Sequence, residues 1–248
     1  LQLTVNTHGG YVSGAKVMGF KDIKGDNNIT LFTDNEQKLN FMLAGKQTNI
    51  VTADLFFTPS NHTDSTLTLT AEAANGGQLV INYHLGENYL VNMQMQTKGL
   101  DGIFAPNYRQ VDIEWEGLCR QQEKGFTFEN RYATLTYKEK NDDSDYLSET
   151  EKVIDEPMEN AIDWLAFKDQ FFSSVLIPKG DIAPNALLSS IPQEKGSGYL
   201  KQYLAKFKTD FDPTGAVPTE MEMYFGPNDF QVLKAVDDEC SFDKDLDM

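Results

Sequence analysis

The chain has 248 residues, of which 40% are hydrophobic and 11% aromatic, a composition that supports a folded core and excludes a disordered or collagen-like chain. Its 21 basic and 38 acidic residues give a net charge of −17, which repels nucleic-acid phosphates and anionic lipid headgroups. Nucleic acid is therefore not expected as a partner. The sequence contains no apolar run near the roughly 20 residues that span a bilayer, so this segment is expected to be soluble.

Alternation of apolar and polar residues predicts β-strands along most of the chain, because successive side chains of a strand point to opposite faces. The first expected strands are residues 11–20, 29–32, 38–43 and 50–57, preceded by a turn at His8-Gly9-Gly10. A meander follows at residues 66–73, 79–85 and 89–96, and the alternation recurs at 111–116, 133–137 and 221–225. Many short strands at close spacing predict a single domain built as an antiparallel sandwich or barrel.

Three further segments depart from simple alternation. Residues 139–156 contain eight acidic side chains and are predicted to be a solvated loop. Residues 158–167 are predicted to be a helix, because Ala161, Ile162 and Leu165 fall at helical spacing behind Pro157, which suits a first helical turn. Residues 199–208 fit both a helix and a strand, and we favour the strand.

A second helix is expected to begin near Pro227. Asn228 can cap its first turn and Gln231 can reciprocate three residues later. Apolar residues form one stripe along this helix, namely Phe230, Leu233 and Val236. The segment after it places Phe242 and Leu246 four residues apart, a spacing that brings side chains together on a helix.

Residues that could carry chemistry do not form a recognisable motif. Asp112, Glu114 and Glu116 would share one face of a strand about 7 Å apart, near the separation used by inverting glycosidases, but we expect a solvated face of an acidic protein. The three histidines, His8, His62 and His84, lie in different segments without metal-ligand spacing. Neither a catalytic residue nor a cofactor or metal site is predicted.

The aromatic residues and the cysteines have two interpretations each. Trp115, Trp164 and the Phe171-Phe172 pair could line a sugar or peptide groove, and core packing is the favoured alternative. Cys119 and Cys240 could form one disulfide in an oxidising compartment, but two free thiols are more common and the bridge is not predicted.

Four segments, in order, resemble the large periplasmic domain of the YidC membrane protein insertase family. They are residues 6–12, 164–172, 175–178 and 223–227. In that family an early glycine-containing turn opens the domain, a Trp-to-Phe-Phe segment leads into a strand ending in Ile-Pro, and a Tyr-x-Gly-Pro run closes it. The last is the most specific here, because Gly226-Pro227 joins a strand to a capped helix. The resemblance covers essentially the whole chain.

This resemblance implies a galactose-mutarotase-like antiparallel β-super-sandwich with short helices near the C-terminal end. It implies a single periplasmic domain over residues 1–248, at the inner membrane of a Gram-negative bacterium, in which residues 227–248 lead toward a membrane core. The implied role is a non-catalytic accessory platform, with nascent inner-membrane proteins and the Sec translocon as partners. Contact with the membrane core or a partner is expected at Phe230, Leu233, Val236, Phe242 and Leu246.

Two other functions remain open from the sequence. A carbohydrate-binding or carbohydrate-active domain could adopt the same fold, since fold does not determine function. That alternative requires His8 or His84 beside two carboxylates in one pocket. An adhesion or assembly module without enzymatic activity is the third possibility.

Overall fold

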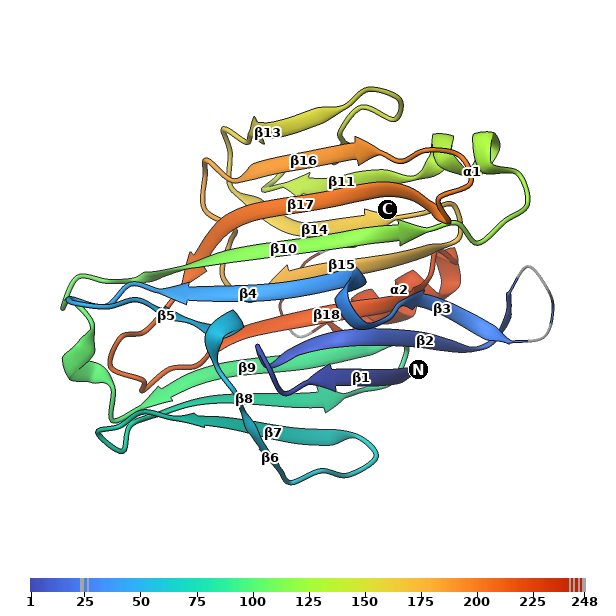
Figure 1. Cartoon of the computed structure of the whole chain (residues 1–248). Coiled ribbons are helices and arrows are strands. Elements are labelled where there is room, and N and C mark those ends of the chain that lie inside the picture. Colours follow the sequence, from blue (N-terminus) through green and yellow to red (C-terminus); the bar gives the residue numbers. More distant parts are fainter. Residues whose placement is uncertain (23–24, 26, 241, 243, 245, 247–248) are drawn as a thin grey trace.

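The structure, a computed structural model, describes residues 1–22, 25, 27–240, 242, 244 and 246. Within this described part, eighteen strands form antiparallel sheets of nine, six and three strands. Figure 1 shows them as two facing layers, with the six- and three-stranded sheets side by side in front of the nine-stranded sheet. The predicted antiparallel sandwich is confirmed.

The nine-stranded sheet runs β12-β11-β14-β15-β18-β9-β8-β7-β6. Its strands are β6 (Thr58–Ser60), β7 (Thr66–Glu72), β8 (Gln78–Leu85), β9 (Leu90–Lys98), β11 (Thr134–Glu139), β12 (Ser144–Tyr146), β14 (Ile162–Lys168), β15 (Phe172–Pro178) and β18 (Thr219–Pro227). The strands β7, β8 and β9 pair in sequence order, so the predicted meander is confirmed.

The six-stranded sheet runs β13-β16-β17-β10-β4-β5. Its strands are β4 (Gln37–Leu43), β5 (Ile50–Val51), β10 (Gln110–Arg120), β13 (Val153–Pro157), β16 (Leu187–Pro192) and β17 (Tyr199–Asp210). The strand β17 confirms the strand predicted at residues 199–208, and it pairs with β10 along eleven residue pairs.

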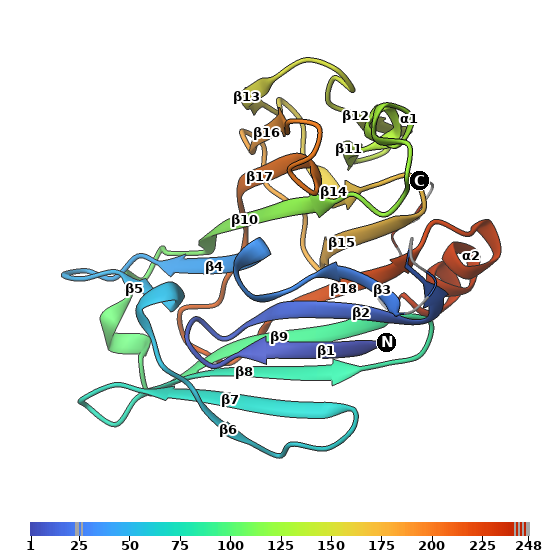
Figure 2. The same ribbon diagram turned by 45° about the vertical axis from the view of Figure 1, so that its right-hand side comes forward.

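The three-stranded sheet consists of β1 (Gln2–Asn6), β2 (Tyr11–Lys21) and β3 (Asn28–Phe32). The turn between β1 and β2 requires glycine, because Gly9 and Gly10 have φ angles of 93° and 73°, which other residues rarely adopt. This sheet lies over the strands β18, β9 and β8 of the nine-stranded sheet, as Figure 2 shows. Tyr83 on β8 donates a hydrogen bond of 2.8 Å to the Gly10 carbonyl across the gap.

Five short helices complete the described residues. They are η1 (Asp34–Glu36), η2 (Thr52–Asp54), η3 (Asp101–Ile103), α1 (Phe126–Tyr132) and α2 (Phe230–Glu239). Of these, α2 is the helix predicted after Pro227, and α1 has no counterpart among the elements predicted from the sequence. No helix in the described part is both long and apolar enough to cross a membrane.

The helix predicted at residues 158–167 is wrong, because residues 162–167 belong to the strand β14 and residues 158–161 form no helix. Leu165 and Phe167 point into the core between the sheets, whereas Trp164 and Ala166 point to a second apolar cluster on the other face of the nine-stranded sheet. A strand buried on both faces shows an unbroken apolar run, and periodicity cannot distinguish such a run from a buried helix.

The acidic segment 139–156 is more ordered than predicted. It contains β12 and begins β13, and both are edge strands. Most of its acidic side chains are exposed, as the prediction of a solvated segment requires. Charged side chains on an edge strand disfavour pairing with another chain.

Candidate functional site

The helix α2 is capped by a side chain, but by a different residue from the one predicted. Asp229 caps it, because its Oδ1 accepts hydrogen bonds from the backbone N–H groups of Gln231 and Val232, at 2.9 and 3.1 Å. The cap predicted at Asn228 is wrong. The Asn228 side chain instead accepts from Ser173 Oγ at 2.6 Å and donates to the Asp169 carbonyl at 3.0 Å, which fastens the end of β18 to β15.

An outer core lies between α2 and the nine-stranded sheet, opposite the inner core that fills the space between the sheets. It is composed of Leu90, Trp164, Ala166, Val175, Ile177, Tyr224, Leu233, Val236 and Leu246. Because Leu233 and Val236 are buried there, the helix stripe predicted as a contact surface packs against the domain itself. Phe230 begins the helix and is 78% exposed.

Three of the described residues after α2, Phe242, Lys244 and Leu246, contact the domain. Leu246 is buried in the outer core and Phe242 packs at its margin. The Lys244 ammonium donates to the carbonyls of Asp163 and Gly180, at 3.1 and 2.9 Å. Burial lowers the pKa of Lys244, against the opposing effect of the Asp163 and Asp181 carboxylates. Of the five positions predicted to contact a partner, Phe230 is therefore the most accessible, and a contact there stays a prediction.

Two further phenylalanines are exposed beside one groove, and the sequence does not mark them as contacts. Phe20 near the end of β2 is 39% exposed, and Phe171 in the turn between β14 and β15 is 43% exposed. Both line a groove of about 340 Å³, which Asp229, the residue before Phe230, borders as well. Positions 20 and 171 come together only through the fold, and no spacing in the sequence signals them.

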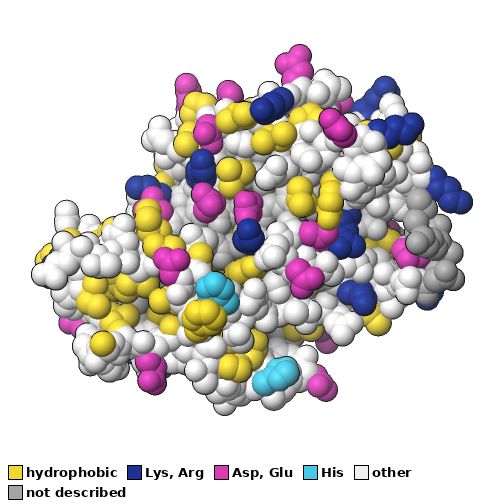
Figure 3. Space-filling model, in the orientation of Figure 1, with side chains coloured by type: hydrophobic (Ala, Val, Ile, Leu, Met, Phe, Trp, Pro, Cys, Tyr) yellow, Lys and Arg dark blue, Asp and Glu magenta, His cyan; other side chains and the backbone are white. Residues whose placement is uncertain are grey.

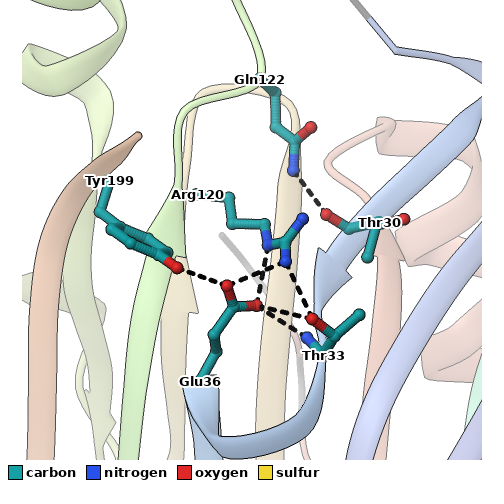
Figure 4. Close-up of polar contacts among 6 residues, drawn as sticks. All are labelled: Thr30, Thr33, Glu36, Arg120, Gln122 and Tyr199. Atoms are coloured by element: carbon teal, nitrogen blue, oxygen red, sulfur yellow. Dashed lines mark hydrogen bonds and ion pairs between the residues drawn. The ribbon is translucent and has the colours of Figure 1, made fainter. Parts of the chain in front are cut away.

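A polar cluster joins η1, β10 and β17 next to a groove of about 530 Å³ (Figure 4). The Arg120 guanidinium donates to both carboxylate oxygens of Glu36, at 2.8 and 2.9 Å, and to Thr33 Oγ1 at 2.9 Å. Tyr199 donates to Glu36 at 2.5 Å. These donors lower the pKa of Glu36, although burial opposes them as the largest single effect. An ionised, fully paired carboxylate suits cross-strand fastening better than proton transfer.

The three acidic residues on β10 face solvent, as predicted. Asp112 Oδ1 lies 3.3 Å from Lys208 Nζ, and Glu116 Oε1 lies 3.0 Å from Lys38 Nζ. Each lysine is the register partner of its acid on the neighbouring strand. These carboxylates therefore act as members of cross-strand ion pairs. A groove of about 580 Å³ passes beside Asp112 and Glu114 and is also lined by Lys206 and Lys208.

The histidines and cysteines do not form a common site in the described part of the chain. His8 stacks on Phe56, with ring centroids 4.3 Å apart, while His62 and His84 are exposed. Among the described residues, no group of three or more His, Cys, Asp or Glu could hold a metal ion. The arrangement that the carbohydrate alternative requires, a histidine beside two carboxylates, is not formed within that part of the chain. Cys119 and Cys240 are both free thiols.

One buried carboxylate, that of Asp169, lies in the turn between β14 and β15. Asp169 Oδ1 accepts hydrogen bonds from the backbone N–H groups of Phe171 and Phe172, at 2.7 and 2.6 Å. Burial nevertheless raises the pKa of Asp169 to about 7. Asp169 also borders a small cavity of about 30 Å³ with Cys119 and Tyr203, a volume sufficient for one water molecule.

Both tryptophans belong to cores. Trp115 is buried in the inner core and stacks on Phe167 with centroids 3.7 Å apart, and Trp164 is buried in the outer core. The favoured core interpretation of both is confirmed. Phe172 is also buried, whereas its neighbour Phe171 is exposed.

The comparisons with known proteins match essentially the whole chain. A family model described as the YidC periplasmic domain matches residues 1–247. A membrane protein insertase YidC from Phocaeicola vulgatus is 43% identical over all of this chain and 40% of its own length. One from Bacteroides fragilis is 38% identical over 96% of this chain and 38% of its own length. The chain thus spans about two fifths of these relatives.

Two solved structures are weakly similar to this chain. A GalM/aldose epimerase homologue from C. elegans is 10% identical, with a TM-score of 0.49, over 92% of this chain and 96% of its own. A bacterial glucoamylase complexed with acarbose is 12% identical, with a TM-score of 0.47, over 90% of this chain and 30% of its own.

Proposed function

Since this chain belongs to the YidC periplasmic domain family, we propose that it is the accessory domain of a membrane protein insertase and performs no reaction itself. In this proposal residues 1–248 form one periplasmic domain at the inner membrane of a Gram-negative bacterium. Residues 227–248 lead from the sandwich toward the membrane-embedded part. The partners are nascent inner-membrane proteins and components of the Sec translocon.

The observation that carries this proposal is the match to named insertases over the full length of the chain. The paired acidic side chains support a structural rather than a catalytic role. Glu36, Asp112 and Glu116 each form an ion pair with a basic residue of a neighbouring element. The arrangement of α2 supports a role in positioning the domain against the membrane-embedded part. The helix is anchored to the sheet through the outer core and presents Phe230 outward.

The proposal is tested in an insertase that carries this domain, purified and reconstituted in vesicles. Deleting residues 228–248 is expected to reduce insertion of a substrate membrane protein. Because the deletion also uncovers the outer core, Phe230→Asp provides a variant that leaves this core filled, and it is expected to reduce insertion as well. Phe56→Asp is the matched control, since Phe56 is 75% exposed and lies on another segment, between η2 and β6.

Normal insertion by both the deletion and Phe230→Asp would overturn the positioning role of α2. Reduced insertion by Phe56→Asp equal to that of Phe230→Asp would show a general effect of surface charge. Circular dichroism and urea unfolding of each variant establish that the domain stays folded.

A further inference from the structure

The strand β1 ends the three-stranded sheet and has one free edge. It pairs with β2 alone, in a sheet of order β1-β2-β3. The Asn6 carbonyl faces β2, because it accepts from the Gly10 N–H at 3.0 Å in the turn between the two strands. Backbone groups alternate between the two sides of an antiparallel strand. The N–H and C=O groups of Leu3 and Val5 therefore point away from β2, toward the free edge.

The chain itself pairs with this side just beyond the end of β1. Residues 55–57 run antiparallel to residues 7–9, and the Phe57 N–H donates to the Thr7 carbonyl at 2.8 Å. Among the described residues, no backbone group pairs with the outer side of β1 itself. The free edge of β1 therefore continues a line along which an extended segment is already bound.

The other edge strands of the described part carry features that hinder pairing with another chain. Such features are charged side chains, proline, a very short strand and backbone groups that are already occupied. The strand β1 reads Gln-Leu-Thr-Val-Asn and has none of them. The features of the other edge strands are Asp145 in β12, Asp155 and Glu156 in β13, Pro59 in β6, the two-residue length of β5, and in β3 the Thr30 carbonyl, which accepts from the Gln122 side chain at 2.9 Å.

The side chains of β1 alternate between solvent and the inner core. Gln2 and Thr4 are exposed, whereas Leu3 and Val5 are partly buried and pack against the inner core. A strand beside β1 would place every second side chain next to Leu3 and Val5. Figure 3 shows acidic and basic side chains interspersed over the six-stranded sheet, and few of them at the place that β1 has in Figure 1. The edge therefore suits a segment in which apolar and uncharged polar residues alternate.

We propose that the free edge of β1 binds an extended segment of a membrane protein that is being inserted, and that this segment adds to the three-stranded sheet as a fourth strand. Hydrogen bonds to the backbone of Leu3 and Val5 provide the binding, and such bonds accept many sequences because every residue except proline offers the same groups. This proposal rests on the proposed function, since an insertase handles polypeptide that has not yet folded.

A second copy of this chain is disfavoured as the occupant. Each copy carries a net charge of −17, so two copies repel each other. A contact limited to the five residues of β1 is also small beside the roughly 1,200 Å² that a stable interface buries. A single extended segment avoids the repulsion, and its small contact permits release, which transit through an insertase requires.

Peptide binding tests the edge in the purified full-length insertase. The probe is a fluorescent peptide of about ten residues in which valine and threonine alternate between terminal lysines, long enough to cover β1 at about 3.4 Å per residue. The matched probe has N-methyl groups on its central amides, which removes the backbone donors and keeps the side chains. Fluorescence anisotropy is expected to show at least tenfold weaker binding of the methylated probe.

Two variants separate the outward N–H of position 3 from its side chain. Leu3→Pro removes this N–H, a change that an edge strand tolerates where the N–H faces solvent. Leu3→Ala keeps the N–H and removes a similar amount of packing. Leu3→Pro is expected to bind the unmethylated probe several-fold more weakly than Leu3→Ala, as the loss of one backbone hydrogen bond implies. Circular dichroism and urea unfolding establish that both variants are folded.

Photocrosslinking identifies the occupant during insertion. Thr4→p-benzoylphenylalanine, in the insertase reconstituted in vesicles, is expected to crosslink to a substrate membrane protein that is arrested during insertion. Ser60→p-benzoylphenylalanine is the matched control, because Ser60 is exposed on the edge strand β6, next to Pro59. The control is expected to give several-fold less crosslink to the substrate.

Three outcomes would overturn the proposal. Equal binding of the two probes, or of the unmethylated probe to the two position-3 variants, would show that the backbone of β1 is not used. Equal crosslinking to the substrate from positions 4 and 60 would show that the substrate does not select this edge. Crosslinks from position 4 to a second copy of this chain alone would make the edge a contact between copies. All three leave the accessory function standing, whereas normal insertion by an insertase without the whole domain would count against that function.

Discussion

The two tryptophans occupy two cores of different construction. Trp115 lies between two sheets and stacks on Phe167, so strands of both layers enclose it. Trp164 lies on the opposite face of the nine-stranded sheet, where one helix and the residues after it form the cover. The inner core therefore holds the layers together, whereas the outer core holds only α2 and the C-terminal residues beyond it. Equal burial of a side chain does not imply an equal role in stability.

The largest expected effect is that of Trp115→Ala. Truncating a buried tryptophan removes its transfer free energy and leaves a cavity, which costs about 3–5 kcal/mol. Because strands of both layers surround Trp115, the whole domain should lose this free energy of unfolding in one cooperative transition. Urea unfolding followed by circular dichroism measures it. A loss near 1 kcal/mol would mean that the inner core relaxes around the cavity.

The buried carboxylate at the end of the inner core should make stability depend on pH. Burial raises the pKa of Asp169 from 3.8 to about 7, so between these pH values the folded state holds a proton that the unfolded state has lost. The free energy of unfolding therefore falls as pH rises from about 4 to about 7, by about 1.4 kcal/mol per unit of pKa shift. Asp169→Asn keeps the Oδ1 acceptor and should flatten this dependence.

Asp212 provides the matched control for this experiment. Its carboxylate also caps a turn, accepting from the N–H groups of Thr214 and Val217 at 2.9 Å each. These hydrogen bonds lower the pKa of Asp212, so its contribution to stability is lost only below about pH 4. Asp212→Asn should leave the slope between pH 4 and 7 unchanged. An unchanged slope in Asp169→Asn would assign the dependence to other groups.

Trp164→Ala tests the outer core directly. We expect a loss of about 2–3 kcal/mol, less than for Trp115→Ala, because the cover can detach without opening the sandwich. Hydrogen exchange should accelerate at the amides of α2 and stay slow at those of β10. Equal losses for the two tryptophan variants, with exchange unchanged in α2, would show that the two cores unfold as one unit.

The difference between the cores also explains which features the sequence reveals. The strands β7 to β10 have one face on the inner core and the other in water, so alternation predicts them correctly. The strand β14 touches both cores, and its unbroken apolar run matches the pattern of a buried helix equally well. The short helix α1 has no apolar stripe comparable to that of α2. Phe20 and Phe171 line one groove, and only the three-dimensional structure shows that they are neighbours.

The smallest expected effect concerns α2 alone. Leu233→Ala removes one of the two buried anchors of the helix, and we expect a local loss of about 2 kcal/mol. The helix should then open more often than the sandwich unfolds, which appears as faster amide exchange in α2 at an unchanged urea midpoint of the sheet signal. Lys234→Ala is the control, because Lys234 is the exposed neighbour and alanine favours a helix. Loss of the sheet signal in Leu233→Ala would place α2 within the cooperative unit, and the outer core would then support the sandwich as the inner core does.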